Sequence, residues 1–87
     1  MKRIEVKKMR WYFRLLEQGA TFYLYAYSRE SKDFDGRIRY DTETETISVT
    51  IPCAADRDSE WAQERARIHF WKVIRDGFPR ERSVCCG

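Results

Sequence analysis

The strongest constraint on the fold is a run of alternating side chains in residues 9–28, interrupted at Gln18-Gly19. Large apolar residues recur at every second position on both sides of the interruption, and successive side chains of a strand point to opposite faces of a sheet. Folding the run at Gln18-Gly19 aligns three apolar pairs: Leu15 with Phe22, Phe13 with Leu24 and Trp11 with Ala26. A slip of one residue would place every apolar side chain opposite a polar one. The pattern therefore predicts a β-hairpin with this register.

Residues 4–17 also have a helical interpretation. Val6, Met9, Phe13 and Leu16 fall on one helical stripe, and Gly19 is a suitable residue just after a helix. The element order would then be α-β-β-β-α. The Trp-Tyr-Phe run at 11–13 is typical of a strand, so we favour the hairpin and keep the helix as the alternative.

A second hairpin is predicted in residues 37–51. Ile38 and Tyr40 alternate with arginines, and Ile47 and Val49 alternate with serine and threonine. A turn at 43–44 pairs Tyr40 with Ile47 and Ile38 with Val49, which aligns the apolar face. Pro52 should end the last strand because it has no amide hydrogen to donate to the ladder.

One helix is predicted from about Arg57 to Asp76. Asp56 is a good N-cap, and Gly77 suits the left-handed conformation that ends many helices, with Phe78 packing back on the last turn. A single apolar stripe should cover the sheet: Ala62, Ala66, Phe70, Val73 and Ile74.

Together these elements predict an α+β fold, namely a four-stranded antiparallel β-meander with one C-terminal α-helix packed on one face. The chain has 87 residues, which is enough for one small core. We therefore expect a single domain over residues 1–87, with a basic N-terminal lead-in (1–8) and a C-terminal tail (79–87).

Composition argues against several classes of protein. The net charge of +3 is too small for a dedicated nucleic-acid binder, and no apolar run is long enough to cross a bilayer. We expect no membrane association and a cytoplasmic location. The three cysteines, an odd number, fit reduced thiols, with Cys53 buried after Pro52.

No catalytic or metal-binding constellation is evident, so we expect no enzymatic activity, no cofactor and no metal. His69 is the only histidine, and it borders the apolar stripe of the helix. Cys85 and Cys86 are adjacent, which does not match the spacing of zinc ligands. The acidic residues at 56–64 fit the N-terminal turns of a helix.

The feature left over is a second sheet face that combines tyrosine with arginine. Its predicted binding residues are Arg10, Tyr12, Arg14, Tyr23, Tyr25, Tyr27, Arg37 and Arg39. Such a face can be simply solvated, or it can bind a protein, since Tyr and Arg are enriched in interface hot spots. The leading functional hypothesis is a non-enzymatic interaction module that binds itself or another protein there. Single-stranded nucleic acid is the alternative, with tyrosines stacking on bases and arginines holding phosphates.

A smaller apolar surplus lies on the helix. Trp61, Ile68 and Trp71 fall outside the core stripe. One of the two tryptophans is expected to seal the edge of the core, and the remaining apolar surface is predicted to be available for a partner or for the C-terminal tail.

Overall fold

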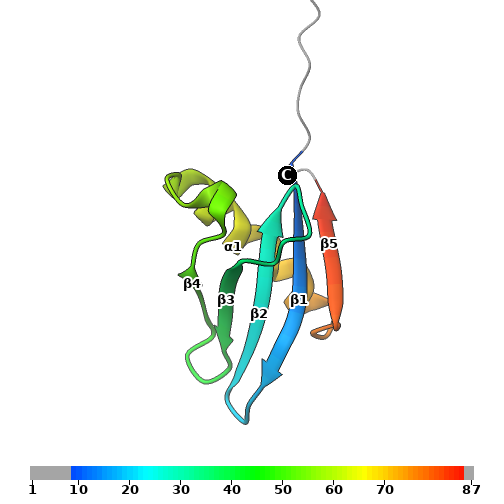
Figure 1. Cartoon of the computed structure of the whole chain (residues 1–87). Coiled ribbons are helices and arrows are strands. Elements are labelled where there is room, and N and C mark those ends of the chain that lie inside the picture. Colours follow the sequence, from blue (N-terminus) through cyan, green and yellow to red (C-terminus); the bar gives the residue numbers. More distant parts are fainter. Residues whose placement is uncertain (1–8, 86–87) are drawn as a thin grey trace, which may run out of the picture.

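The computed structural model describes residues 9–85 and has an α+β fold (Figure 1). The elements are β1 (Arg10–Gln18), β2 (Phe22–Arg29), β3 (Gly36–Asp41), β4 (Thr46–Ile51), the 3₁₀ turn η1 (Ala54–Asp56), α1 (Glu60–Arg75) and β5 (Glu81–Cys85). The strands form one antiparallel sheet in the order β4-β3-β2-β1-β5. The predicted basic lead-in at residues 1–8 lies outside the described residues.

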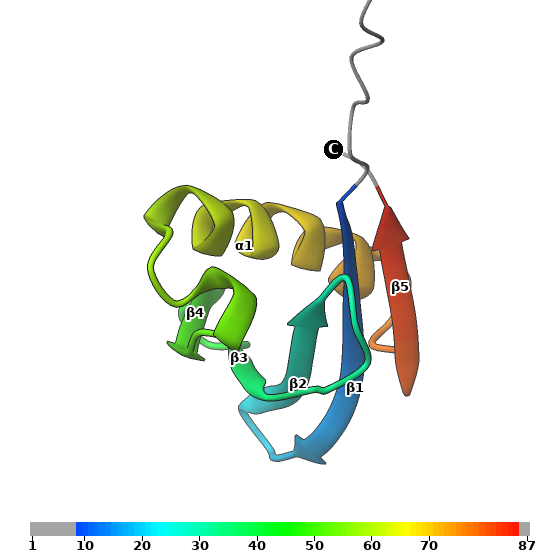
Figure 2. The ribbon, with the colours of Figure 1, turned by 45° about the horizontal axis from the view of Figure 1, so that its top comes forward.

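Helix α1 packs across one face of the sheet, and no helix of residues 9–85 covers the opposite face (Figure 2). We call these the covered face and the open face. The core on the covered face is rich in aromatic rings. Its buried members are Trp11, Phe13, Tyr25, Tyr27, Ile38, Tyr40, Ile47, Cys53, Ala66, Phe70, Val73 and Val84.

The β1–β2 hairpin forms, which excludes the helical alternative for the described part of residues 4–17, but its predicted register is wrong. Phe13 lies opposite Tyr27, three residues beyond the predicted Leu24, and a bulge shifts the pairing again between Leu15 and Glu17. Because an odd shift exchanges the two faces of a strand, the tyrosines of β2 lie on the covered face.

Two partners from other segments explain this register. Gly36 lies opposite Tyr27, and a Cβ atom on Gly36 would come within 2.5 Å of the Tyr27 ring. The absent side chain thus leaves room for the ring on the covered face. The Tyr27 hydroxyl then accepts a hydrogen bond of 3.1 Å from the backbone N–H of Cys53. Burying the tyrosines removes large ring surfaces from water, and the buried hydroxyls keep a hydrogen-bond partner.

The β3–β4 hairpin has the predicted pairs. Tyr40 lies opposite Ile47 and Ile38 opposite Val49. The Asp41 carboxylate accepts hydrogen bonds from the backbone N–H groups of Glu43 and Thr44, at 2.9 and 3.1 Å, which fixes the turn locally.

Helix α1 ends as predicted and begins later than predicted. Phe78 N–H donates to the carbonyl of Val73, Gly77 N–H donates to that of Ile74, and Gly77 has φ of +84°, which is a Schellman ending. At the other end the N-cap is Ser59, whose hydroxyl accepts from Ala62 N–H at 3.1 Å. Asp56, the predicted cap, belongs to η1 and is buried.

The segment expected to be a tail supplies a fifth strand. Strand β5 pairs with β1, with Val84 opposite Trp11 and Glu81 opposite Arg14. The predicted α+β meander with one helix is thus correct in outline and lacks one edge strand. Within residues 9–85, no helix is both long and apolar enough to cross a membrane.

Candidate functional site

Five of the eight predicted binding residues lie on the open face. Arg10, Tyr12 and Arg14 alternate along β1 with the buried Trp11 and Phe13. Arg37 and Arg39 alternate along β3 with buried residues in the same way. The open face of β2 carries residues of the other parity: Phe22, Leu24, Ala26 and Ser28.

The other three predicted residues, Tyr23, Tyr25 and Tyr27, lie on the covered face, so their predicted placement is wrong. Tyr25 and Tyr27 have no exposed surface. The Tyr25 hydroxyl donates to the carbonyl of Pro79 at 2.6 Å, and burial raises its pKa to about 12. Burial likewise raises the pKa of Tyr27. The ring of Tyr23 stacks on Phe78 with centroids 3.6 Å apart. All three tyrosines pack on the core, and Tyr25 and Tyr27 are fully buried while Tyr23 is partly buried.

The connection between β2 and β3 passes over the open face (Figures 1 and 2). Ala26 and Ser28 are buried although they point away from the helix. The Ser28 hydroxyl donates to the carbonyl of Ser31 in this connection. Arg37 donates from Nη1 to the carbonyls of Phe34 and Gly36, both at 2.8 Å. Arg37 therefore holds the connection in place and has this structural role on the open face.

Aromatic rings on the open face are each accompanied by a cation. The Arg14 guanidinium lies 4.2 Å from the ring centre of Phe34, and the Arg39 guanidinium lies 4.3 Å from that of Phe22. The ammonium of Lys32 lies 5.6 Å from the ring centre of Tyr12. These distances are within the range of cation–π attraction, so the cations and rings support one another.

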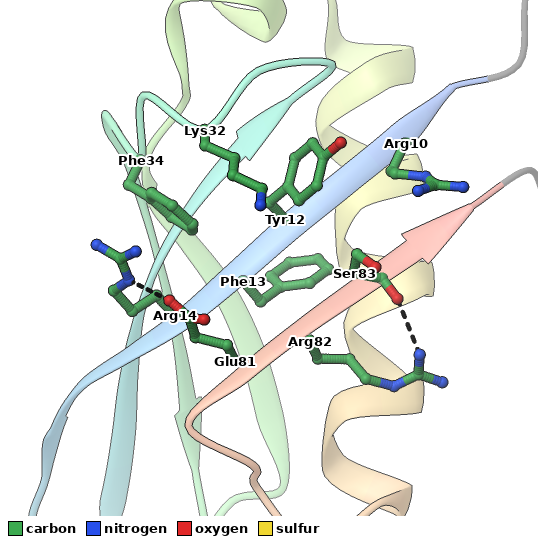
Figure 3. A pocket seen from close by; sticks show the side chains of 9 residues that line it. All are labelled: Arg10, Tyr12, Phe13, Arg14, Lys32, Phe34, Glu81, Arg82 and Ser83. Carbon is green, nitrogen blue, oxygen red and sulfur yellow. Dashed lines mark hydrogen bonds and ion pairs between the residues drawn. The ribbon is translucent and has the colours of Figure 1, made fainter.

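A groove of about 360 Å³ lies between β1, β5 and the β2–β3 connection (Figure 3). We call it the β1–β5 groove. It is lined by Arg10, Tyr12, Phe13, Arg14, Lys32, Phe34, Glu81, Arg82 and Ser83. Phe34 and Lys32 close it on the side of the connection, while Glu81 and Ser83 come from β5 (Figure 3).

The charge in this groove is predominantly positive. Arg14 is neutralised by Glu81, with Nε 2.7 Å from Oε1, and Arg82 is neutralised by Asp76, also at 2.7 Å. Arg10 and Lys32 form no ion pair with any residue in the described range 9–85. The groove therefore combines aromatic walls with two cations that lack a carboxylate partner there.

The sequence interpretation did not include the lining residues Lys32, Phe34, Glu81 and Ser83. Phe34 is the single large apolar residue in a charged loop, which was a usable signal that this loop folds back on the domain. Strand β5 also has an alternation, in which Val84 is buried while Glu81 and Ser83 are exposed. Five residues are too few for that pattern to predict a strand.

A structural cluster of polar groups on the covered face is centred on Asp56. Asp56 has no exposed surface, accepts a hydrogen bond from Arg29 Nε, and lies 3.4 Å from Trp11 Nε1. Arg29 also donates to the carbonyl of Ala55 at 2.9 Å. This buried ion pair attaches η1 to strands β1 and β2.

His69 and Cys53 are both buried on the covered face. The His69 ring packs against Trp11, and its Nε2 has no hydrogen-bond partner within residues 9–85. Burial and the nearby Arg65 and Lys72 lower its pKa. Burial, with the nearby Asp56, raises the pKa of the Cys53 thiol to about 11, which makes it a poor nucleophile at neutral pH.

The prediction of reduced thiols is confirmed at Cys53 and wrong at Cys85. Cys53 is a free, buried thiol. Cys85 is disulfide-bonded, so the prediction of a reduced thiol is wrong there. Among residues 9–85, no group of three or more His, Cys, Asp or Glu side chains could hold a metal ion.

Comparisons of this chain with protein-family models, with curated proteins and with solved structures found no match.

Proposed function

We propose that this chain is a small, non-enzymatic interaction module whose open face binds an acidic, partly apolar segment of another protein in the β1–β5 groove. The observation that carries the proposal is the pair of cations, Arg10 and Lys32, beside the rings of Tyr12 and Phe34. Carboxylates of a partner would pair with the cations, and apolar side chains would contact the rings.

The charge of the open face favours a different protein over a second copy. Two copies meeting through this face would bring arginines against arginines, and like charges in an interface cost free energy. An acidic partner has the opposite effect, because it is attracted over a distance and neutralises the groove on binding.

Single-stranded nucleic acid is the second candidate, since Arg10, Lys32 and Arg39 could contact phosphates. Two features weigh against it. The rings of Phe22 and Phe34 already have guanidinium groups against them, so a base would have to displace an arginine in order to stack. Glu81 also places a negative charge in the groove, where it would repel a phosphate.

Fluorescence anisotropy with three labelled probes tests the proposal. The probes are a ten-residue peptide alternating Glu with Leu and Phe, the same peptide with Lys in place of Glu, and a ten-nucleotide oligothymidylate. We expect binding of the Glu peptide that weakens with added salt, and no binding of the Lys peptide. Tighter binding of the oligothymidylate at the same salt would contradict the proposal in favour of the second candidate.

Charge reversals locate the binding surface. Arg10→Glu and Lys32→Glu should each weaken binding of the Glu peptide about tenfold, because each replaces an attraction by a repulsion. Arg57→Glu is the matched control, since Arg57 is an exposed arginine that does not line the groove. Equal effects of all three reversals would mean that only the net charge matters, and would contradict a specific site.

A further inference from the structure

The outer face of α1 carries a large apolar surface that the fold leaves exposed. Trp61, Ile68 and Trp71 are 60%, 45% and 51% exposed. They lie on the side of the helix away from the buried residues Ala62, Ala66, Phe70 and Val73. The Trp71 ring also contacts Tyr40 edge-on, with centroids 6.3 Å apart, so only its outer half is available. Residues 81–85 do not cover them, because these residues form β5 at the edge of the sheet.

These residues belong to one continuous stripe that has charges within it. The stripe consists of Trp61, Glu64, Ile68, Trp71 and Arg75, separated by alternating steps of three and four residues. Such spacing is that of a helix that packs along another helix. Within the described residues Arg75 forms no ion pair, and Glu64 forms one with the exposed Arg67, at 3.0 Å.

The stripe is complementary to itself in the antiparallel direction. Ile68 and Trp71 lie at equal distances on either side of the point between residues 69 and 70. Glu64 and Arg75 lie at equal distances on either side of the same point. A two-fold axis at that point would bring Ile68 of each copy against Trp71 of the other. The same axis would bring each Glu64 against Arg75 of the other copy.

We infer that the occupant of this face is a second copy of the chain, with the two α1 helices packed antiparallel through this stripe. A parallel arrangement would place Glu64 against Glu64 and Arg75 against Arg75, and like charges disfavour it. A two-fold axis makes every contact occur twice, which is the commonest symmetry of protein dimers. The interface leaves the open face of both copies accessible.

The available area indicates a dimer that dissociates on dilution. A whole tryptophan side chain offers up to about 250 Å², so the exposed fraction of Trp71 supplies roughly 130 Å² per copy. The two-fold axis places Trp61 opposite Phe78, which lies beyond the end of α1, so Trp61 is at the edge of this contact. With Ile68 and the stems of the charged residues, two copies bury less than the roughly 1,000 Å² of a specific interface, which is the range of weak, transient contacts. Association should therefore depend on protein concentration.

Sedimentation velocity over a range of concentrations, combined with a charge-reversal cycle, tests this inference. Glu64→Arg and Arg75→Glu should each weaken dimerisation about tenfold, because two attractive pairs become two repulsive ones. The double variant E64R/R75E should restore dimerisation, since it exchanges the charges and keeps their complementarity. Glu43→Arg, in the exposed β3–β4 turn, is the control and should change nothing.

Three outcomes would overturn the inference. The first is a monomer at every concentration. The second is a double variant as weak as either single one. The third is a dimer that persists in Ile68→Asp, which places a charge at the centre of the stripe. Circular dichroism of each variant verifies folding, and the exposed positions of these residues make loss of the fold unexpected. Binding of the Glu peptide is measured separately, so the two proposals can fail independently.

Discussion

The two faces of the sheet use aromatic side chains in different ways. On the covered face, rings pack against rings: Phe70 lies 5.3 Å from Phe13 and 5.1 Å from Tyr25, centre to centre. On the open face, rings pack against cations, as Phe34 does with Arg14. Ring-on-ring packing excludes water and stabilises the fold, whereas ring-on-cation packing keeps both groups accessible. The difference separates the residues that hold the structure from those available to a partner.

The largest expected contrast is between Phe70→Ala and Phe22→Ala. Phe70 has no exposed surface and touches two other rings, so its truncation should cost about 3–5 kcal/mol of unfolding free energy. Phe22 on the open face is half-buried beside Arg39, and its truncation should cost about 1 kcal/mol. Urea unfolding followed by tryptophan fluorescence measures both. Equal losses of unfolding free energy in the two variants would mean that Phe22 stabilises the fold as much as a core residue does, which would contradict the comparison.

The next contrast is between the ion pairs of the two faces. Asp56→Asn removes one partner of a pair whose side chains are 0% and 15% exposed, and should cost about 3 kcal/mol. Glu81→Gln removes one partner of a pair whose side chains are 61% and 50% exposed, and should cost less than about 1 kcal/mol. The same urea titrations apply. A larger loss in Glu81→Gln would refute the separation of structural from accessible charges.

Removing single hydroxyls should give a smaller contrast. Tyr25→Phe leaves the carbonyl of Pro79 without its 2.6 Å hydrogen bond, which should cost about 1 kcal/mol. Tyr12→Phe should leave the free energy of unfolding unchanged, since the Tyr12 hydroxyl has no hydrogen-bond partner among residues 9–85. Thermal unfolding by circular dichroism compares the two variants, and a loss in Tyr12→Phe alone would contradict this assignment.

The smallest effect at neutral pH concerns His69. Burial, Arg65 and Lys72 lower its pKa in the folded state below the ordinary value of 6.5. The unfolded chain therefore binds a proton first, so His69 costs no stability above pH 6.5 and destabilises the fold as the pH falls below it. Nuclear magnetic resonance of the imidazole protons should show a transition below pH 6.5. A transition above that value would contradict the burial of a neutral ring against Trp11.

The two hairpins show how far local pattern predicts pairing. In β3–β4, apolar residues occupy one parity and polar residues the other, and Asp41 fixes the turn from within the hairpin. One choice of turn aligns the apolar residues, and the pairs Tyr40–Ile47 and Ile38–Val49 were predicted, while a bulge shifts the register between Arg37 and Ile38. In β2, both parities are apolar enough to be buried, with Phe22, Leu24 and Ala26 on one and three tyrosines on the other. Local pattern could not decide between them.

The candidate site was predictable only in part for the same reason. Arg10, Tyr12 and Arg14 were predicted on the open face because β1 alternates clearly between Trp11, Phe13 and these residues. The groove itself needs Lys32 and Phe34 from a connection and Glu81 from an edge strand. These residues come from segments without a strong periodic signal, and only their packing on β1 brings them together.

The sequence by itself determined the α+β class, the β3–β4 pairing and the end of α1, since each depends on contacts between residues close in the chain. Tertiary structure alone decided which face of β2 packs under α1. The Tyr25 and Tyr27 hydroxyls find their hydrogen-bond partners in Pro79 and Cys53, which are 54 and 26 residues away. Without those partners, burying a hydroxyl would cost more than burying Leu24 or Ala26. A face defined by such distant contacts cannot be inferred from the alternation of the strand itself.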